Sequence, residues 1–225
     1  MPNELENIKT RYEARKASDV NKLYSSNNFY NNAVIAEREQ FYYQVFKQKF
    51  QYTHNLSLLE IGAGSGGNIS GFLKMGFQLK HLVANELLDD RVEALKNNFP
   101  ELEIYPGNVL EANFNQQFDV VFQSTVFTSI LDKALKQQIA NKMLELVKPN
   151  GIILWYDFIY DNPNNKDVKG VSKQEIRQLF AKASKITFKK VTLAPPIGRR
   201  VGKLYGVLNG MFPFLRSHVV AVIEK

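Results

Sequence analysis

The stretch that decides the fold is Leu58-Leu59-Glu60-Ile61-Gly62-Ala63-Gly64-Ser65-Gly66-Gly67-Asn68. An apolar run that contains one acidic residue passes into closely spaced small residues, and a helical pattern follows them. This order predicts a strand, a tight turn and a helix. Glycine lets the backbone take angles that a side chain forbids and lets a ligand lie against main-chain atoms. The turn is therefore the predicted binding site.

Two kinds of nucleotide ligand are compatible with these glycines. Gly62, Gly64 and Gly67 satisfy the G-x-G-x-x-G of dinucleotide-binding folds. A pyrophosphate binds at the bare N-terminus of a helix, whereas a carboxylate just before the first glycine suits a cationic ligand. Glu60 occupies that place as a fixed negative charge, and so favours the cationic ligand. A glycine-rich turn with no ligand is the other interpretation.

The same residues resemble the first motif of class I S-adenosylmethionine-dependent methyltransferases, an acidic residue followed by G-x-G-x-G. Glu60, Gly62, Gly64 and Gly66 match it. The resemblance covers about residues 50–193 well and the final strand acceptably. It implies S-adenosylmethionine as the cofactor and S-adenosylhomocysteine as the product.

Composition predicts one domain. The chain has 225 residues, is 44% hydrophobic and contains no Pro/Gly/Ser-rich linker. It has no cysteine, which excludes disulfides, thiolate zinc sites and a cysteine nucleophile. The N-terminus does not resemble a signal peptide, and no apolar run approaches the ~20 residues of a membrane span. We expect a cytoplasmic protein, with the inner membrane surface as a further possibility.

The basic charge is local. The net charge is +7, yet Lys185 to Lys225 alone carries eight Lys/Arg against one acidic residue, and the rest of the chain is balanced. This is not the pattern of a uniformly basic nucleic-acid binder, so no nucleic-acid partner is expected.

Alternating strands and helices predict a doubly wound α/β sheet. We expect a helical lid over 1–50, a cofactor-binding core over 51–193, and a basic helix insertion with the final strand over 194–225. The resemblance implies the strand order 3-2-1-4-5-7-6 with the last strand antiparallel. The predicted strands are 58–61, 81–86, 103–105, 118–122, 152–157, 186–193 and 219–223.

A second acid, Glu86, ends the second predicted strand 24 residues beyond Gly62. Folds of this type place a carboxylate at about that distance on the ribose hydroxyls. Its other interpretation is an acid at a helix start. The resemblance puts the adenine amino group on Asn108, where the family often has an acid. The expected cofactor residues are Glu60, Gly62, Ala63, Gly64, Gly66, Glu86, Leu87, Asn108, Val109, Gln123 and Tyr24.

The N-terminal 50 residues are rich in aromatic side chains, and Tyr24 lies in an Asn/Ser-rich stretch that breaks the helical pattern. In the family that the chain resembles, N-terminal helices cover the cofactor and shape the acceptor pocket. Tyr12 and Arg15 are therefore further candidates.

Four glycines, Gly198, Gly202, Gly206 and Gly210, recur every fourth residue between the last two strands, beside an apolar helical face. Each weakens a free helix by roughly 1 kcal/mol relative to alanine. Close packing of this glycine stripe on the domain is the first explanation, and an interfacial membrane helix over 198–215 is the second.

A narrower resemblance, to methyltransferases of bacterial surface-polysaccharide biosynthesis, rests on Trp155-Tyr156-Asp157-Phe158, Asn162-Pro163, Leu193-Ala194-Pro195-Pro196 with Arg199-Arg200, and His218. It implies O-methylation of a sugar or other small glycan-type acceptor, including phosphorylated or lipid-linked forms. Tyr156, Arg199 and Arg200 are the candidate acceptor residues, and Arg216 could also meet phosphate. Asp157 and His218 are the candidate bases, each with a structural role as its alternative. No His/Asp/Glu cluster has metal-ligand spacing, so no metal is inferred.

Two other functions remain open at this point. An NAD-dependent oxidoreductase fits the degenerate glycine motif but not Glu60. A non-catalytic adaptor could bind RNA or anionic lipid through the basic C-terminal segment.

Overall fold

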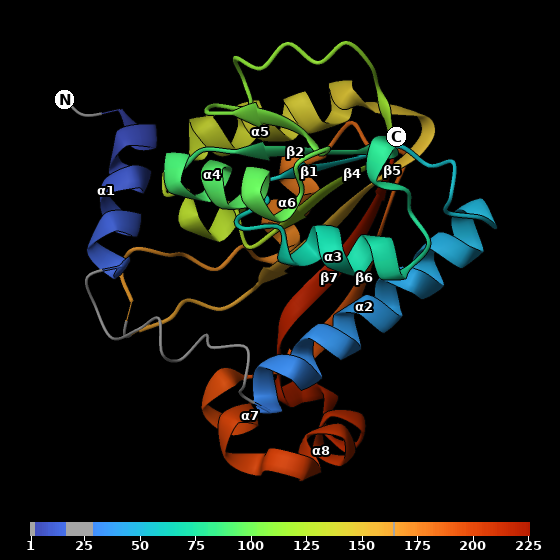
Figure 1. The fold of residues 1–225 in the computed structure, drawn as a ribbon. Coiled ribbons are helices and arrows are strands. Elements are labelled where there is room, and N and C mark those ends of the chain that lie inside the picture. The colour runs from blue at the N-terminus through green and yellow to red at the C-terminus, as the bar shows by residue number, and fades with distance from the viewer. Residues whose placement is uncertain (1–2, 17–28, 164) are drawn as a thin grey trace.

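The computed structural model describes residues 3–16, 29–163 and 165–225. Its centre is a seven-stranded sheet in the order β3-β2-β1-β4-β5-β7-β6, which confirms the predicted topology (Figure 1). The first five strands are parallel, and β7 runs antiparallel between β5 and β6. The strands are β1 Leu58–Ile61, β2 Leu82–Glu86, β3 Glu103–Pro106, β4 Phe118–Ser124, β5 Val147–Phe158, β6 Lys185–Leu193 and β7 Arg216–Glu224.

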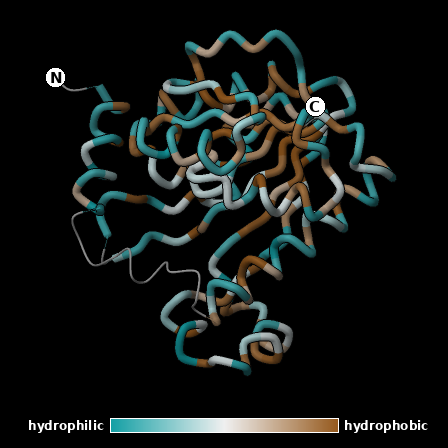
Figure 2. Tube along the Cα trace, in the orientation of Figure 1, coloured by the Kyte–Doolittle hydropathy of each residue, from teal (hydrophilic) through white to brown (hydrophobic). Residues whose placement is uncertain are grey.

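Helices cover both faces of the sheet. The helices are α1 Glu4–Lys16, α2 Phe29–Phe50, α3 Gly67–Lys74, α4 Asp89–Asn98, α5 Lys133–Leu146, α6 Lys173–Leu179, α7 Pro195–Val201 and α8 Tyr205–Met211. Buried side chains of α2, α3 and α4 pack on one face, and those of α5 and α6 on the other. Because both faces are covered, β1 and β2 are buried along their whole length, and the centre of the sheet is largely hydrophobic (Figure 2).

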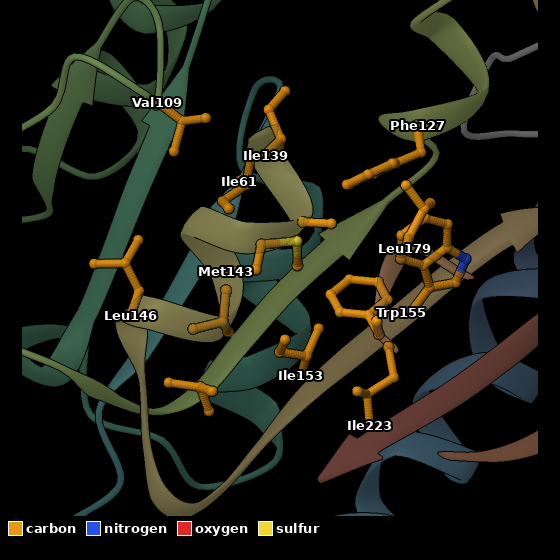
Figure 3. Close-up of a cluster of buried hydrophobic side chains, with 14 of the residues drawn as sticks. Ile61, Val109, Phe127, Ile139, Met143, Leu146, Ile153, Trp155, Leu179 and Ile223 are labelled. Carbon is orange, nitrogen blue, oxygen red and sulfur yellow. The ribbon is translucent and has the colours of Figure 1, made fainter. Parts of the chain in front are cut away.

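Trp155 is at the centre of the α5/α6 side of the core (Figure 3). Its side chain is fully buried, and its ring lies 4.4 Å from that of Phe127 and 5.9 Å from that of Phe180, measured between centroids. Two helices on this side begin with a side-chain cap. Asp132 accepts a hydrogen bond from the Leu135 amide, and Ser172 accepts one from the Glu175 amide.

The N-terminal 50 residues do not form one lid. Tyr42, Val45 and Phe46 of α2 are buried in the core on the α3 side of the sheet, so α2 is a structural helix. Helix α1 buries Ile8 beside the carboxyl ends of the strands. The predicted lid is therefore α1, and Tyr24 lies outside the described residues.

The expected single helix after residue 198 is two short helices, because Gly202 has a left-handed φ of 49° and ends the first of them. Residues 195–215, which comprise α7, a 3-10 turn, α8 and a second 3-10 turn, form a projection below the sheet that we call the C-terminal knob (Figure 1). The stripe explanation holds only for Gly198, whose missing side chain leaves room for the Tyr30 ring. Among the described residues, no other group lies within 4 Å of where a Cβ would stand at Gly202, Gly206 or Gly210. Close packing of the whole stripe was thus wrong.

No helix in the described part of the chain is both long and apolar enough to cross a membrane.

Candidate functional site

A cavity of about 310 Å³ follows the carboxyl edge of the sheet from β3 to β4. Ligands of open α/β sheets bind outside this edge, and the volume is that of a small-molecule site. The wall is formed by the turns after β1, β2, β3 and β4, by α1, and by one arginine of α2. The residues that line this wall include Leu5, Ile8, Tyr12, Arg38, Gly62, Ala63, Gly64, Asn68, Glu86, Leu87, Arg91, Asn108, Val109, Ser124, Thr125, Val126 and Ser129.

The glycine turn has the backbone that the sequence predicts. Gly62, Gly64 and Gly66 all have left-handed φ angles, of 68°, 59° and 89°. A side chain at Gly62 would overlap Val126, whereas the space beside Gly64 is open. The main chain at Gly64 is therefore exposed to the cavity, as a close ligand contact requires.

Glu86 is coupled to this turn. Its Oε2 accepts a hydrogen bond from the Gly64 amide at 2.7 Å, and its Oε1 accepts one from the Leu88 amide at 3.0 Å. The side chain is buried yet lines the cavity. Each carboxylate oxygen keeps a lone pair, so Glu86 can still accept hydrogen bonds from two hydroxyl groups.

Glu60 is separated from the cavity. It is fully buried, and its Oε1 accepts a 2.6 Å hydrogen bond from Asn68, which does line the wall. Burial raises the pKa of Glu60 to about 8, against the favourable Asn68 hydrogen bond and the nearby Arg38 charge. The expected fixed negative charge in direct contact with a ligand is thus not what this structure contains.

Arg38 was missed because nothing in the α2 sequence distinguishes it from a solvated helix residue. Its guanidinium donates to Asn68 Oδ1 at 2.8 Å and to Ser124 Oγ at 3.4 Å, and lies 5.3 Å from the Tyr156 ring centroid. The Nε atom is buried without a hydrogen-bond partner. Arg38 has no carboxylate partner among the ion pairs of the described residues. It is therefore a cation on the cavity wall at the β4 end.

The other predicted cofactor residues divide into two groups. Ala63, Leu87, Asn108 and Val109 line the cavity. Gln123 does not line it, because its Oε1 accepts from the Val126 amide and its amide group faces the Tyr156 carbonyl. Gln123 instead supports the turn after β4.

That turn contains further wall residues that the sequence did not reveal. Thr125 has a left-handed φ of 59°, a strained conformation for a β-branched residue. Such strain concentrates at functional sites. Ser129 follows, and its hydroxyl is 3.1 Å from the hydroxyl of Tyr12 on α1.

Helix α1 covers the cavity through Leu5, Ile8 and Tyr12. Polar contacts hold it in place: Lys16 pairs with Asp90 at 2.8 Å, and Arg91 lies 4.5 Å from the Tyr12 ring centroid. Arg15 reaches away from the cavity toward Asp167, at 3.8 Å.

The two candidate bases are on opposite faces of the sheet. Asp157 is opposite Val219 in the β5–β7 ladder, and His218 is opposite Phe158, so the two side chains alternate in direction. They cannot act together on one acceptor.

Asp157 is fully buried and does not reach the cavity wall. It accepts hydrogen bonds from the Thr128 and Phe158 amides, and burial raises its pKa to about 7. These contacts correspond to the turn-capping alternative for Asp157 and not to a base that meets a ligand in the cavity.

His218 stacks on Tyr156, with ring centroids 5.1 Å apart, and its Nδ1 is 2.9 Å from Ser217 Oγ. Burial, with the Arg38 charge, lowers the pKa of His218 to about 4, so the imidazole is neutral at pH 7. Tyr156 itself is buried, and its hydroxyl is 3.1 Å from Thr192 Oγ1. Neither residue lines the cavity.

The basic residues expected to meet phosphate differ in availability. Arg199 and Arg200 are exposed on α7, outside the cavity wall. Arg216 is not available, because its guanidinium donates to Asn209 Oδ1, to the Asn209 carbonyl and to the Lys190 carbonyl. Within the described residues no group of His, Asp and Glu side chains could hold a metal ion.

Comparison with known proteins gives a matching family and a shared fold. Residues 59–155 match the family model described as a methyltransferase domain. A search of curated proteins finds no significant match.

Similar solved structures include the N-methyltransferase NodS from Bradyrhizobium japonicum WM9 in complex with S-adenosylhomocysteine, at 12% identity and a TM-score of 0.67, over 97% of this chain and 98% of that chain. DesVI from Streptomyces venezuelae is 12% identical with a TM-score of 0.61, over 92% and 96%. The glycopeptide N-methyltransferase MtfA with sinefungin is 14% identical with a TM-score of 0.55, over 81% and 92%. At such identities the likeness is one of fold. Together with the matched domain over residues 59–155, it shows that this chain shares the fold of S-adenosylmethionine-dependent methyltransferases.

Proposed function

We propose that this methyltransferase O-methylates a sugar or glycan-type acceptor, and that the cavity at the carboxyl edge is its cofactor site. The observation that carries the cofactor site is the hydrogen bond between Glu86 and the Gly64 amide, which joins a buried carboxylate to an open glycine turn. S-adenosylmethionine, when bound, supplies a methyl group on a positively charged sulfur.

The residues along the wall fit such a ligand in the order of the strands. Asn108 and Val109, after β3, would hold the purine, and Glu86, at the end of β2, the ribose hydroxyls. Gly62 to Gly64 would lie against the middle of the ligand. Arg38, at the β4 end, would hold the carboxylate of its amino-acid part, since an unpaired guanidinium suits a carboxylate.

Methyl transfer depends mainly on holding the acceptor atom in line and excluding water. Helix α1 is suited to both tasks, because Ile8 and Tyr12 cover the cavity opposite the turn after β4. His218 remains the proposed base for a hydroxyl acceptor, since it is neutral at pH 7 and partly exposed at the same edge of the sheet.

An amine acceptor on a glycan is the second candidate. It is favoured by the low basicity of His218, because an amine that is already deprotonated needs no strong base. NodS and MtfA, which share this fold, are also N-methyltransferases.

The acceptor is further proposed to be phosphorylated or lipid-linked, with Arg199 and Arg200 meeting its phosphate. Tyr156, the other expected acceptor residue, is buried and would act only through its neighbours. The support is that both arginines are exposed on the side of the sheet where β6 ends, which is the edge that carries the cavity.

Isotope transfer tests this function. Purified protein is incubated with methyl-labelled S-adenosylmethionine and with candidate acceptors of each class, namely neutral sugars, amino sugars and their lipid-linked diphosphates. Label in a sugar ether supports the O-methyl proposal, and label in an amine supports the second candidate. Label in neither class, from protein that binds S-adenosylhomocysteine, would refute the acceptor proposal.

A further inference from the structure

The C-terminal knob exposes large apolar side chains. Leu204, Val207, Met211 and Phe214 are 60%, 57%, 67% and 69% exposed. Isolated apolar residues on a surface are ordinary, but four within eleven residues of one projection form a patch. Figure 2 shows hydrophobic stretches of the knob alternating with hydrophilic ones.

Three of these residues share a helical face. Leu204, which directly precedes α8, and Val207 and Met211 of α8 are spaced by three and four, so they align along one side. Tyr205 and Asn209 lie on the inward side, where the Tyr205 hydroxyl and the Asn209 amide each donate a 2.7 Å hydrogen bond to Glu37. The apolar side therefore faces outward on a knob that α2 holds in place.

The exposed charged residues beside this patch are basic. Arg199, Arg200 and Lys203 are exposed on the same knob, and the chain has no acidic residue from 176 to 223. A protein partner of mixed charge would not need a uniformly basic surface. An anionic surface is complementary to one, and interfacial helices combine apolar side chains with basic ones in this way.

Nothing within the described fold covers this patch. At Gly206 and Gly210, on the outward side, no group of residues 3–16, 29–163 or 165–225 lies within 4 Å of where a Cβ would stand. The helices of the knob have seven residues each, too short to enter the bilayer deeply. Contact along the surface is therefore the geometry that they allow.

We propose that the C-terminal knob docks on a bilayer surface that contains anionic lipids, with Leu204, Val207, Met211 and Phe214 entering the headgroup region and Arg200 and Lys203 meeting lipid phosphates. The knob follows β6 and precedes β7, at the sheet edge that carries the cavity. Docking would hold that edge near a lipid-linked acceptor. This purpose rests on the proposed function, but docking itself needs neither cofactor nor acceptor.

Vesicle co-sedimentation of the full chain tests the proposal, without cofactor or acceptor. Wild type is expected to bind vesicles with about one third phosphatidylglycerol more tightly than pure phosphatidylcholine vesicles. Arg200→Gln with Lys203→Gln should weaken binding to the anionic vesicles by about 25-fold, at about fivefold for each charge near the surface. This difference should shrink as salt rises.

Met211→Ser with Phe214→Ser should reduce binding to the anionic vesicles at least tenfold. The matched control is Tyr52→Ser, which removes a side chain that is 65% exposed beyond the far end of α2 and should bind as wild type does. Wild type that binds neither vesicle, or a serine variant that binds equally well, would overturn the proposal. So would light scattering that shows a dimer for wild type and a monomer for the serine variant, because the patch would then join two copies of the chain.

Discussion

Replacing Arg38 by methionine is expected to weaken the binding of S-adenosylhomocysteine while leaving that of 5′-methylthioadenosine unchanged. The second ligand has the same nucleoside and sulfur but lacks the amino-acid carboxylate. Arg38 lines the cavity with no carboxylate partner among the described ion pairs and with a buried, unpartnered Nε. A hydrogen bond to a charged group contributes about 1.5–3 kcal/mol, which is about 10- to 150-fold in the dissociation constant.

Isothermal titration calorimetry of both ligands measures this effect as a ratio of affinities. Two variants serve as controls. Arg91→Met removes another arginine of the wall, beside Tyr12, and should leave the ratio unaltered. Glu86→Ala should weaken both ligands together, because both carry the ribose. Thermal unfolding of each variant checks that the fold is intact.

Two outcomes would contradict this role of Arg38. Equal loss for both ligands would mean that Arg38 only supports the wall through Asn68 and Ser124. No loss for either ligand, with a raised Michaelis constant for the acceptor, would assign the anion to the acceptor. Either result would refute the carboxylate assignment.

The remaining predictions concern stability and the acceptor. Because Asp157 has a pKa raised to about 7 in the folded chain, the folded state keeps a proton that the unfolded chain loses near pH 4, and stability falls as pH rises between these values. Urea unfolding measures the free energy of unfolding of wild type and of Asp157→Asn. The difference between the two should therefore decline by up to about 1.4 kcal/mol per pH unit from about pH 4 to 7 and stay constant above pH 7. A difference that does not change with pH would contradict the raised pKa of the buried Asp157 carboxyl. Gly198→Ala should lower the free energy of unfolding by about 1–3 kcal/mol, because the added methyl group overlaps the Tyr30 ring. Gly206→Ala should leave the free energy of unfolding unchanged or raise it by up to about 1 kcal/mol, because its Cβ has open space. Equal effects of the two substitutions in thermal unfolding would show that the two sites do not differ. Arg199→Ala with Arg200→Ala should raise the acceptor's Michaelis constant and leave S-adenosylhomocysteine binding intact, and equal loss of both would make the segment merely structural.

The sequence by itself determined the sheet. Its strands are apolar runs that end in turn residues, and local periodicity is enough to find them. Their order came from the family resemblance of the glycine turn, and the structure confirms it. Gly62, Gly64 and Glu86 were found for the same reason, since they stand at strand ends where parallel strands bring neighbouring turns together.

Only the tertiary structure decided what depends on direction and on distant contacts. The sequence did not single out Arg38, and it placed the charge of Glu60 beside the ligand. Whether either side chain is buried or lines the cavity depends on the packing between α2, α3 and β4. Asp157 and His218 were both named as candidate bases, and only the strand register shows that their side chains lie on opposite faces of the sheet. The glycines after residue 198 have a helical period, but a positive φ at Gly202 breaks the helix, so the period did not become a packed stripe. A period describes which residues could share a face, and only packing in three dimensions decides whether that face meets anything.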